Sequence, residues 1–403
     1  MASDQAPDSK QHKPATVCVH GGYRATAENP AVVAPIVSST TFLLDDEAYA
    51  RMLSGRADEA LIYTRIKNPS LDVVQDRIAR LEGAERALVF ASGMAAIHAA
   101  VMSCVKHGSV IVAPREIYGS AWDLFANLLK PLGIETRFVD MSNAGELERA
   151  IVDSRPAVVY AESISNPTLT VCDLRVVARH ARAAKAALIV DATFATPILQ
   201  RPLALGADLV LHSATKYMGG HSDLIGGVVA GSNARMQSVY RWMQLAGGCM
   251  DPHAAFLLDR GLKTLPLRMR AHIENAAALA EHLSRHPRVK SVLYPGLAAH
   301  RSHEIGRELL SGFGGMLSFV VAGGDAAALR CIRALELALE ASSLGGVETL
   351  VSLPFNTSHA RLSPAERQAA GIADGFVRVS VGIEDARDLI EDFDRALERS
   401  ATA

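Results

Sequence analysis

The sequence predicts an α/β fold with a doubly wound, mostly parallel sheet and a smaller C-terminal α/β domain. Short apolar segments rich in β-branched residues alternate with amphipathic segments of helix length, which is typical of parallel strands joined by crossover helices. The chain has 403 residues, of which 49% are apolar, so it can bury a large core in two or three domains. The expected strands are residues 87–90, 110–113, 135–139, 157–160, 187–190, 208–211 and 227–230.

Several of these strands are followed directly by polar or ionisable residues. Helices are expected between them at residues 94–105, 120–129, 145–152 and 174–184. Open α/β sheets bind ligands beyond the carboxyl ends of their strands, so the residues in these positions should meet at one edge of the sheet. They are Ser92, Gly93, Met94, Asn166, Asp191, Ala192, Thr193 and the run from Ser213 through Thr215 to Lys216.

Lys216 is the residue with the clearest chemical meaning. It follows the hydroxyl residues Ser213 and Thr215 in the run HSATKY, and Asp191 ends the preceding apolar strand. Pyridoxal phosphate (PLP) needs a lysine for its aldehyde, donors for its phosphate and a buried carboxylate for its pyridine nitrogen. Taken alone, the Ser-x-Thr-Lys run is more simply explained as a solvated turn. The polar residues at the other strand ends, which should lie at the same edge of the sheet, favour a PLP site instead.

The segment from Ser92 to Met94 is suited to the phosphate, because it opens a helix whose N-terminal amides attract anions. An ordinary capped turn is the alternative, but Ser213 and Thr215 offer further donors. A carboxylate at Asp191 would be costly at the end of a buried strand unless it were paired with a cation. A protonated pyridine nitrogen is such a cation.

Arg378 lies in the run FVRVSV, where the valines alternate onto one face and leave the arginine on the other. A surface arginine is the usual explanation of this pattern. An amino-acid substrate, however, needs a bidentate partner for its carboxylate, and arginine is the residue suited to provide it. We therefore expect Arg378 to bind substrate.

Nine motifs together resemble the PLP-dependent enzymes of cysteine and methionine metabolism, over about residues 16–397. The family includes cystathionine synthases and lyases, homoserine-ester sulfhydrylases and methionine γ-lyases. The motifs are YTRIKNPS from Tyr63, ASGMAA from Ala91, IYG from Ile117, ESISNPT from Glu162, DATFATP from Asp191, HSATKY from His212, RGLKTL from Arg260, SLGGVET from Ser343 and VRVSVG from Val377.

The resemblance implies the PLP-dependent aminotransferase-like fold (fold type I) and assigns roles around the cofactor. Lys216 resembles the lysine that binds PLP and shuttles protons, and Asp191 the partner of the pyridine nitrogen. Tyr118 resembles the ring that stacks on the cofactor and passes a proton. The phosphate site would consist of Ser92, Gly93, Met94, Ser213 and Thr215.

Other roles implied by the resemblance concern the substrate and the neighbouring subunit. Arg378, Ser343 and Asn166 resemble the residues that hold the substrate carboxylate. Tyr63 and Arg65 match a pair that reaches the phosphate of a neighbouring subunit. A homo-oligomer, with a tetramer built from dimers, is therefore expected.

The reaction implied by the resemblance is γ-replacement or γ-elimination on an L-amino acid with a γ leaving group, through a vinylglycine-type quinonoid. A homoserine ester, S-adenosylmethionine or a related sulfur amino acid would be the substrate, with a second nucleophilic substrate in a replacement. A β- or γ-eliminating lyase of cystathionine or methionine, which releases a thiol, a 2-oxo acid and ammonia, is the alternative. A binding module that has lost catalysis is disfavoured, because Lys216, Asp191, Tyr118 and Arg378 are all present.

Some positions depart from the family patterns and leave the substrate open. Ser120 and the pair Met243-Gln244 replace the cysteine and the lysine-aspartate pair of methionine γ-lyases. Ser342 replaces a glutamate common in cystathionine enzymes. Ala192, His98 and Leu353 are further departures. Together, these differences suggest that the entrance of the substrate site is changed while the cofactor site is retained.

The chain divides into three expected parts. Residues 1–66 would form an N-terminal arm, with residues 1–14 disordered, and residues 67–262 the PLP-binding domain. Residues 263–403 would form the C-terminal domain, with strands at 315–321 and 376–381 and helices at 265–286, 326–339 and 384–398.

Composition argues against several other classes of protein. A net charge of −2 gives no reason to expect nucleic acid as a partner, and no apolar run approaches the ~20 residues that span a membrane. Five cysteines without a CxxC pair indicate reduced thiols in a cytoplasmic protein. No metal site is expected, and His212 and His221 are interpreted as structural.

Overall fold

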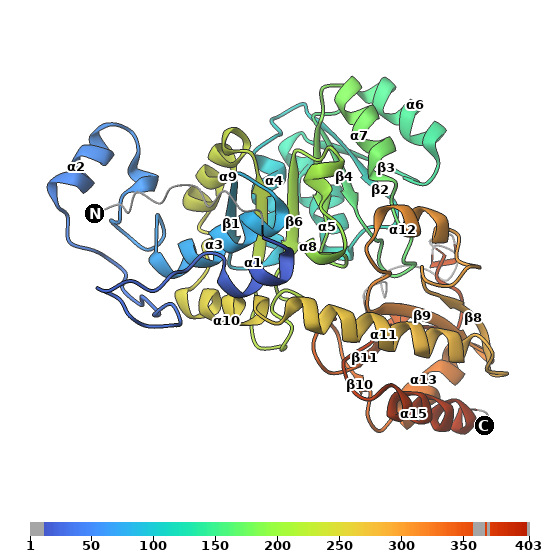
Figure 1. The fold of residues 1–403 in the computed structure, drawn as a ribbon. Helices are drawn as coiled ribbons and strands as arrows, with labels where there is room; N and C mark the ends of the chain where they lie inside the picture. Colours follow the sequence, from blue (N-terminus) through green and yellow to red (C-terminus); the bar gives the residue numbers. More distant parts are fainter. Residues whose placement is uncertain (1–11, 358–366, 369–370, 401–403) are drawn as a thin grey trace.

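A seven-stranded sheet forms the centre of the larger part of the molecule (Figure 1). The computed structural model describes residues 12–357, 367–368 and 371–400. The strand order is β1-β7-β6-β5-β4-β2-β3, and only β7 runs antiparallel to its neighbours in this sheet. The strands are β1 Arg86–Phe90, β2 Val110–Pro114, β3 Glu135–Val139, β4 Val158–Glu162, β5 Ala187–Asp191, β6 Leu209–Ser213 and β7 Gly227–Gly231. The predicted doubly wound, mostly parallel sheet is confirmed.

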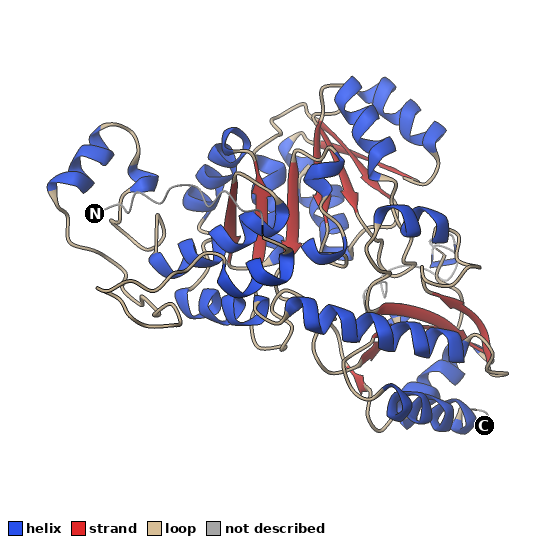
Figure 2. Ribbon diagram, in the orientation of Figure 1, coloured by secondary structure: helices blue, strands red, loops and turns tan. Residues whose placement is uncertain are grey.

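Both faces of this sheet are buried except at the edge strand β3, which explains why the other strands are almost continuously apolar. In β1, for example, Leu88 and Phe90 face one core and Ala87 and Val89 face the other. Helices cover both faces (Figure 2). One face carries α4 Gly93–Met102, α5 Gly119–Asp123 and α9 Asn233–Ala246, and the other carries α3 Pro69–Glu82, α6 Ala144–Ser154, α7 Leu174–Ala183 and α10 Pro252–Leu262.

The helix expected over residues 120–129 is shorter and less regular than predicted. The helix α5 ends at Asp123, and a single π-helical turn, Leu124–Leu128, follows it. The amide of Leu129 then bonds the carbonyl of Leu124 at 3.0 Å. Pro131 comes next and has no N–H to continue an α-helical ladder, so a 3₁₀ turn, Lys130–Leu132, ends the segment.

A second sheet of five strands, in the order β10-β11-β12-β9-β8, lies in the C-terminal part of the chain (Figure 1). Its strands are β8 Val289–Leu293, β9 Met316–Val321, β10 Leu339–Glu340, β11 Leu350–Ser352 and β12 Phe376–Ser380. Side chains of Leu279, Phe319, Val377 and Phe393 share one core between this sheet and its helices. Those helices are α11 Leu265–Leu283, α13 Gly324–Ala334 and α15 Ala386–Arg399.

The expected helix over residues 326–339 was wrong beyond residue 334. The buried carboxylate of Asp392 accepts hydrogen bonds from the amides of Glu336, Leu337 and Ala338, at 2.9 to 3.1 Å. These amides therefore bond a side chain of α15, and the chain leaves the helix and enters β10. Two shorter helices complete the description: α8 Thr196–Leu199 follows β5, and α12 His303–Leu309 follows β8.

In the segment before α3, the first helix packs against α3 and α11, whereas the second lies beyond the edge of the first sheet and far from both sheets (Figure 1). These two helices are α1 Pro14–His20 and α2 Asp46–Leu53. The expected disorder of residues 1–14 falls mostly outside the described residues, but Pro14 already belongs to α1. Among the described residues, no helix is both long enough and apolar enough to cross a membrane.

Candidate active site

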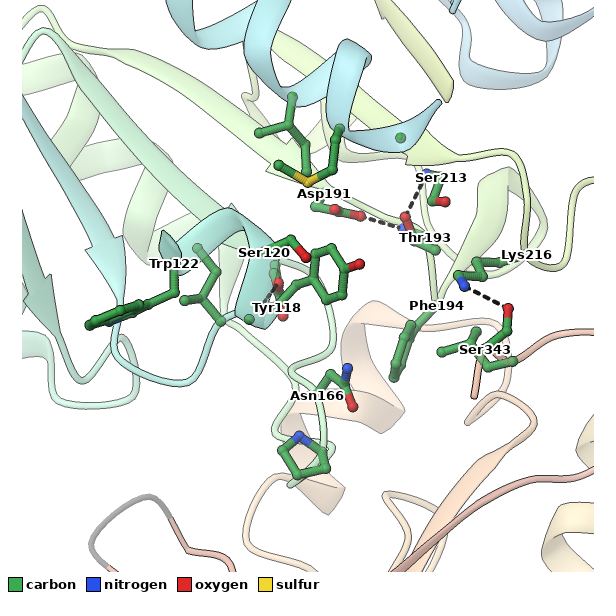
Figure 3. A pocket seen from close by; sticks show the side chains of 18 of the residues that line it. Tyr118, Ser120, Trp122, Asn166, Asp191, Thr193, Phe194, Ser213, Lys216 and Ser343 are labelled. Carbon is green, nitrogen blue, oxygen red and sulfur yellow. Dashed lines mark hydrogen bonds between the residues drawn. The ribbon is translucent and has the colours of Figure 1, made fainter. Parts of the chain in front are cut away.

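A cavity of about 1000 Å³ opens beyond the carboxyl ends of β4, β5 and β6, where the two parts of the chain meet. Figure 3 shows its side chains converging from both parts. Most of the residues that the sequence singled out line this cavity. They are Ser92, Gly93, Met94, Tyr118, Asn166, Asp191, Ser213, Thr215, Lys216, Ser343 and Arg378.

Lys216 lies in the turn that follows β6, where its amide bonds the carbonyl of Ser213 at 3.1 Å. Its Nζ donates a hydrogen bond to Ser343 Oγ at 2.7 Å (Figure 3). Burial, helped by the positive charge of Arg378, lowers the pKa of Lys216 to about 8. A lysine with this pKa has more neutral amine near neutral pH than a free lysine, and the neutral amine is the nucleophile and base.

Two carboxylates, the buried Glu162 and the partly buried Asp191, lie at neighbouring strand ends. Glu162 and Asp191 are paired in the register of β4 and β5. Burial and the charge of Asp191 raise the pKa of Glu162 well above its usual range, and burial also raises the pKa of Asp191. Asp191 accepts hydrogen bonds from the hydroxyl of Tyr160 at 3.3 Å and from the amide of Thr193 at 2.9 Å. A cation facing Asp191 would relieve this concentration of negative charge, and a protonated pyridine nitrogen fits that requirement.

The N-terminus of α4 forms an anion site on the cavity wall. Ser92 caps the helix by accepting the amide of Ala95 at 3.1 Å, and the first intrahelical bond runs from Ala96 N to Ser92 O. The amides of Gly93 and Met94 precede that bond, so they have no partner within the helix. A Cβ atom at Gly93 would lie 2.9 Å from Ser213 Oγ, so a larger residue would fill the cradle. A phosphate group fits this donor set.

Thr193 joins two of the strand ends, and the sequence placed it among the strand-end residues without giving it a role in the site. Its hydroxyl oxygen accepts the amide of Ser213 at 2.8 Å while its own amide bonds Asp191. Thr215 is held in turn by Gly226, to whose carbonyl it donates at 3.2 Å and from whose amide it accepts at 3.0 Å. Thr193 follows β5 directly, so its strand-end position was the signal that could have identified it.

Tyr118 turns its ring into the cavity with the hydroxyl on the side of Lys216 (Figure 3). Its backbone amide donates to Glu162 Oε1 at 2.8 Å. Glu162 is therefore a site residue that the sequence reasoning missed. Like Asp191, it ends an apolar strand, and that shared position could have identified it.

Arg378 is a buried residue of β12, with a relative exposure of 8%, so it is not a surface arginine. Its Nη1 donates to Asn166 Oδ1 at 3.3 Å and its Nη2 to the carbonyl of Ser343 at 3.0 Å. Burial lowers its pKa to about 10. Both of these contacts are to neutral oxygen atoms, so the guanidinium has no negatively charged partner in them. A substrate carboxylate would supply that charge.

Ser343 contacts both ionisable groups of the cavity. Its hydroxyl accepts from Lys216 and its carbonyl accepts from Arg378. The residue has a φ of 83°, a left-handed conformation that a non-glycine side chain rarely adopts. Such strain is typical of positions where a surrounding structure holds a functional group in place.

Tyr63 and Arg65 are not among the described residues that line the cavity of their own chain. Arg65 donates to the carbonyl of Gln244 at 2.9 Å, and its guanidinium lies 5.6 Å from the centre of the Tyr63 ring. Within one chain the structure therefore does not bring this pair to the other predicted site residues.

The departures from the family patterns fall in two groups. Ser120 and Ser342 line the cavity. Ala192, Met243 and Leu353 lie in hydrophobic cores, the carbonyl of Gln244 accepts from Arg65, and His98 packs edge-on against a tryptophan ring of α9. Only the first group is placed to contact a substrate directly.

The two histidines near Lys216 have protein partners. His212 Nε2 lies 2.6 Å from Glu82 Oε1, with both side chains buried, and His221 Nδ1 lies 2.9 Å from the carbonyl of Gly219. Over residues 12–357, 367–368 and 371–400, no group of three His, Cys, Asp or Glu side chains has the arrangement of a metal site.

Comparisons with known proteins agree with the geometry. A family model described as Cys/Met metabolism PLP-dependent enzyme matches residues 15–398. L-methionine gamma-lyase of Pseudomonas putida is 40% identical, over 96% of this chain and 98% of that protein. Cystathionine gamma-lyase of Bacillus subtilis (strain 168) is 41% identical, over 96% and 99%. O-succinylhomoserine sulfhydrylase of Pseudomonas aeruginosa is 41% identical, over 95% and 94%.

A solved structure is similar as well. Cystathionine gamma synthase from Xanthomonas oryzae pv. oryzae, in complex with aminoacrylate and cysteine, superposes with a TM-score of 0.91 at 39% identity, over 96% of this chain and 98% of that one. The expected fold type and the expected cofactor, PLP, are confirmed by these matches. The chain belongs to the Cys/Met metabolism family of PLP-dependent enzymes.

Proposed function

We propose that the protein catalyses γ-replacement or γ-elimination on an L-amino acid that carries a γ leaving group. A homoserine ester, S-adenosylmethionine or a related sulfur amino acid would be the substrate. The observation that carries this proposal is the meeting of Lys216, Asp191 and Arg378 around one cavity. In this proposal, Lys216 serves as a base, Asp191 as a partner for a pyridine nitrogen and Arg378 as a partner for a carboxylate, and the three line the same cavity.

PLP, when bound, supplies an electron sink that stabilises negative charge on the substrate carbons. Asp191 would hold the pyridine nitrogen in its protonated form, because burial makes a neighbouring cation favourable to this carboxylate. The amides of Gly93 and Met94, with the hydroxyls of Ser92, Ser213 and Thr215, would bind the phosphate.

Lys216 would move the protons. Once a substrate is bound, its Nζ would take the proton from Cα, release that proton, and as a neutral amine again take one from Cβ, which would allow the γ group to leave. A pKa of about 8 keeps part of the amine neutral near neutral pH. Ser343 Oγ, 2.7 Å away, orients the amine, and the hydroxyl of Tyr118 can deliver a proton to the leaving group.

Arg378 and Asn166 would fix the substrate carboxylate. Arg378 has five N–H donors, and its contacts with Asn166 and Ser343 occupy two of them. A carboxylate bound to the others would orient the substrate with its Cα and Cβ protons toward Lys216. A misplacement of only ~1 Å can cost ~10²-fold in rate, so this orientation matters for both proton transfers.

A lyase is the alternative, favoured by the similarity to the methionine and cystathionine gamma-lyases of Pseudomonas putida and Bacillus subtilis. In an elimination, water replaces the second nucleophile, and the products are a thiol, a 2-oxo acid and ammonia. Ser120 and Ser342 line the cavity and would take part in this choice, because they are the departures placed nearest a substrate.

Deuterium exchange tests the reaction class. In heavy water, a γ-specific enzyme should place deuterium at both Cα and Cβ of L-norleucine, an amino acid without a γ leaving group, because a Cβ proton must be lost before the γ group. Nuclear magnetic resonance of the recovered amino acid gives the two exchange rates. Exchange confined to Cα, with homoserine esters, methionine, cystathionine and S-adenosylmethionine also giving no γ loss, would instead indicate a β-eliminating lyase.

We further propose a homo-oligomer, a tetramer built from dimers, in which the arm of residues 1–66 docks on a second copy. The arm exposes large apolar side chains, among them Leu43 at 97% and Leu53 at 90% exposure. Apolar surface of this kind is typical of a protein interface. In the same proposal residues 67–262 bind PLP, residues 263–403 form the C-terminal domain, and the protein works in the cytoplasm.

Subunit mixing tests whether the active site is shared. If Tyr63 and Arg65 reach the phosphate of a second subunit, Arg65→Ala and Lys216→Ala subunits should complement each other. A mixed dimer then contains one site in which both residues are intact, so part of the activity should return. Lys216→Ala subunits mixed only with each other are the control. Mixed oligomers that are verified by mass and remain inactive would exclude a shared site.

A further inference from the structure

Glu116 lies between β2 and Tyr118 and is the acceptor for the loop of residues 163–171, which follows β4. Its Oε2 accepts hydrogen bonds from the hydroxyls of Ser165 and Thr170, each at 3.2 Å, and from the hydroxyl of Thr168. Three side chains of one loop thus donate to a single carboxylate oxygen. Hydrogen bonds to an ionised acceptor are stronger than those between neutral groups.

Arg301, which lies in the chain segment after β8, holds the same carboxylate from the other side. Its Nη2 lies 2.8 Å from Glu116 Oε1 and 2.9 Å from Oε2, and it also contacts the hydroxyl of Thr170. Ser302 accepts the amide of Val171 at 3.0 Å. The loop is therefore held between the first sheet and the C-terminal part of the chain.

The same loop carries Asn166, whose carboxamide oxygen accepts from Arg378 at 3.3 Å. The carbonyl of the next residue, Pro167, accepts from Ser318 of β9 at 3.0 Å. The position of Asn166 against Arg378 thus depends on how the loop is fixed. Glu116 fixes it through the residues on both sides of Asn166, namely Ser165 and Thr168.

We propose that Glu116 is a positioning residue for the substrate carboxylate. It sets the loop so that Asn166 and Arg378 present one binding site, and Arg301 keeps Glu116 in the required orientation. The proposal rests on the proposed function, in which Arg378 binds that carboxylate. Glu116 lines the cavity, but it is not among the residues that the sequence assigned to substrate or cofactor.

An exposed ion pair alone would not have this effect. Arg301 is half-exposed, with a side-chain exposure of 51%, and such pairs contribute little to stability. Thr168, by contrast, is only 2% exposed. Without Glu116, the hydroxyls of Ser165 and Thr168 would lose their shared acceptor and retain their mutual contact at 2.8 Å. A buried donor that loses its partner disfavours the present loop conformation.

The test compares two ligands that differ only in the carboxylate. L-Norleucine has the group and L-norleucinamide lacks its charge, and the binding of each to the PLP-loaded protein can be followed by the absorption of the cofactor. Glu116→Ala should weaken norleucine binding by roughly 10-fold, which corresponds to ~1.4 kcal/mol, and leave norleucinamide binding nearly unchanged. Cofactor content and the melting temperature should stay close to those of the parent protein.

Glu308→Ala is the matched control. Glu308 of α12 pairs with Arg175 of α7 at 2.8 Å, so it is another carboxylate bound to an arginine across the same two parts of the chain, although it is more exposed than Glu116. Among the described residues, Glu308 bonds Arg175 and not the loop of residues 163–171, so the variant should leave the affinity for both ligands unchanged. A loss in this control as large as that in Glu116→Ala would overturn the proposal.

Arg378→Ala separates failure of this inference from failure of the proposed function. If Arg378→Ala does not reduce the preference for norleucine, Arg378 does not bind the carboxylate and the proposed function is wrong. If Arg378→Ala reduces it and Glu116→Ala does not, only the role of Glu116 is wrong. Should Glu116→Ala fail to fold, Thr168→Val removes one donor of the same contact. The same selective loss is then expected, and an equal loss for both ligands contradicts it.

Discussion

Replacing Lys216 by alanine is expected to abolish deuterium exchange at both Cα and Cβ of L-norleucine. Both exchange rates should fall by ~10²–10⁴-fold, the range for a single general acid–base residue. Both fall together because one amine is proposed to serve both carbons. The parent protein should be yellow, and borohydride should attach the cofactor to Lys216. The variant should still bind the cofactor without a covalent bond, since the anion site at α4 and the hydroxyl of Ser213 are intact.

Peptide mapping and exchange rates measure the two parts of this prediction. Lys290→Ala removes an exposed lysine of β8 and should change neither. Reduced cofactor found on a lysine other than Lys216, or retention of Cβ exchange alone in the variant, would show that another group performs the proposed step.

Replacing Arg378 by alanine is expected to weaken binding of an amino-acid substrate by ~2–5 kcal/mol, the range for truncation of one partner of a buried charge pair. The guanidinium is buried and its contacts with Asn166 and Ser343 are to neutral oxygens. Removal of the cation therefore leaves a bound carboxylate without a counter-charge. Titration of the dissociation constant for L-norleucine measures the effect.

Arg387→Ala, which removes an exposed arginine of α15, serves as the control and should leave the dissociation constant unchanged. A weakening in Arg378→Ala that is equally large for L-norleucinamide would mean that the arginine supports the cavity and does not bind the carboxylate.

The first sheet and its strand ends could be predicted because its strands are buried on both faces. Such strands are continuous apolar segments, so the point where a polar residue appears marks the end of the strand, as at Asp191 and Ser213. The second sheet gave weaker signals. β8 exposes Lys290 and Ser291, and β10 has only two residues, so neither has a recognisable pattern.

Parts of the candidate site could not be predicted, for two physical reasons. Glu116 and Arg301 are separated by 185 positions, and only the folded chain brings them together. The partners of Tyr63 and Arg65 are proposed to belong to another subunit, which no pattern within one chain can reveal. Local motifs identified Lys216 because its neighbours in sequence are also its neighbours in space.

The double contact of Ser343 has a consequence for the kind of molecule that can enter. One atom of this residue holds the amine of Lys216 and another holds the guanidinium of Arg378. In the proposed function, a ligand whose amine and carboxylate share one carbon would bind the cofactor beside Lys216 through its amine and Arg378 through its carboxylate, and its second attachment would benefit from a high effective concentration. A simple amine or a simple acid would make only one of these two attachments. With the distance between Lys216 and Arg378 fixed by Ser343, the site would favour α-amino acids over their deaminated or decarboxylated counterparts.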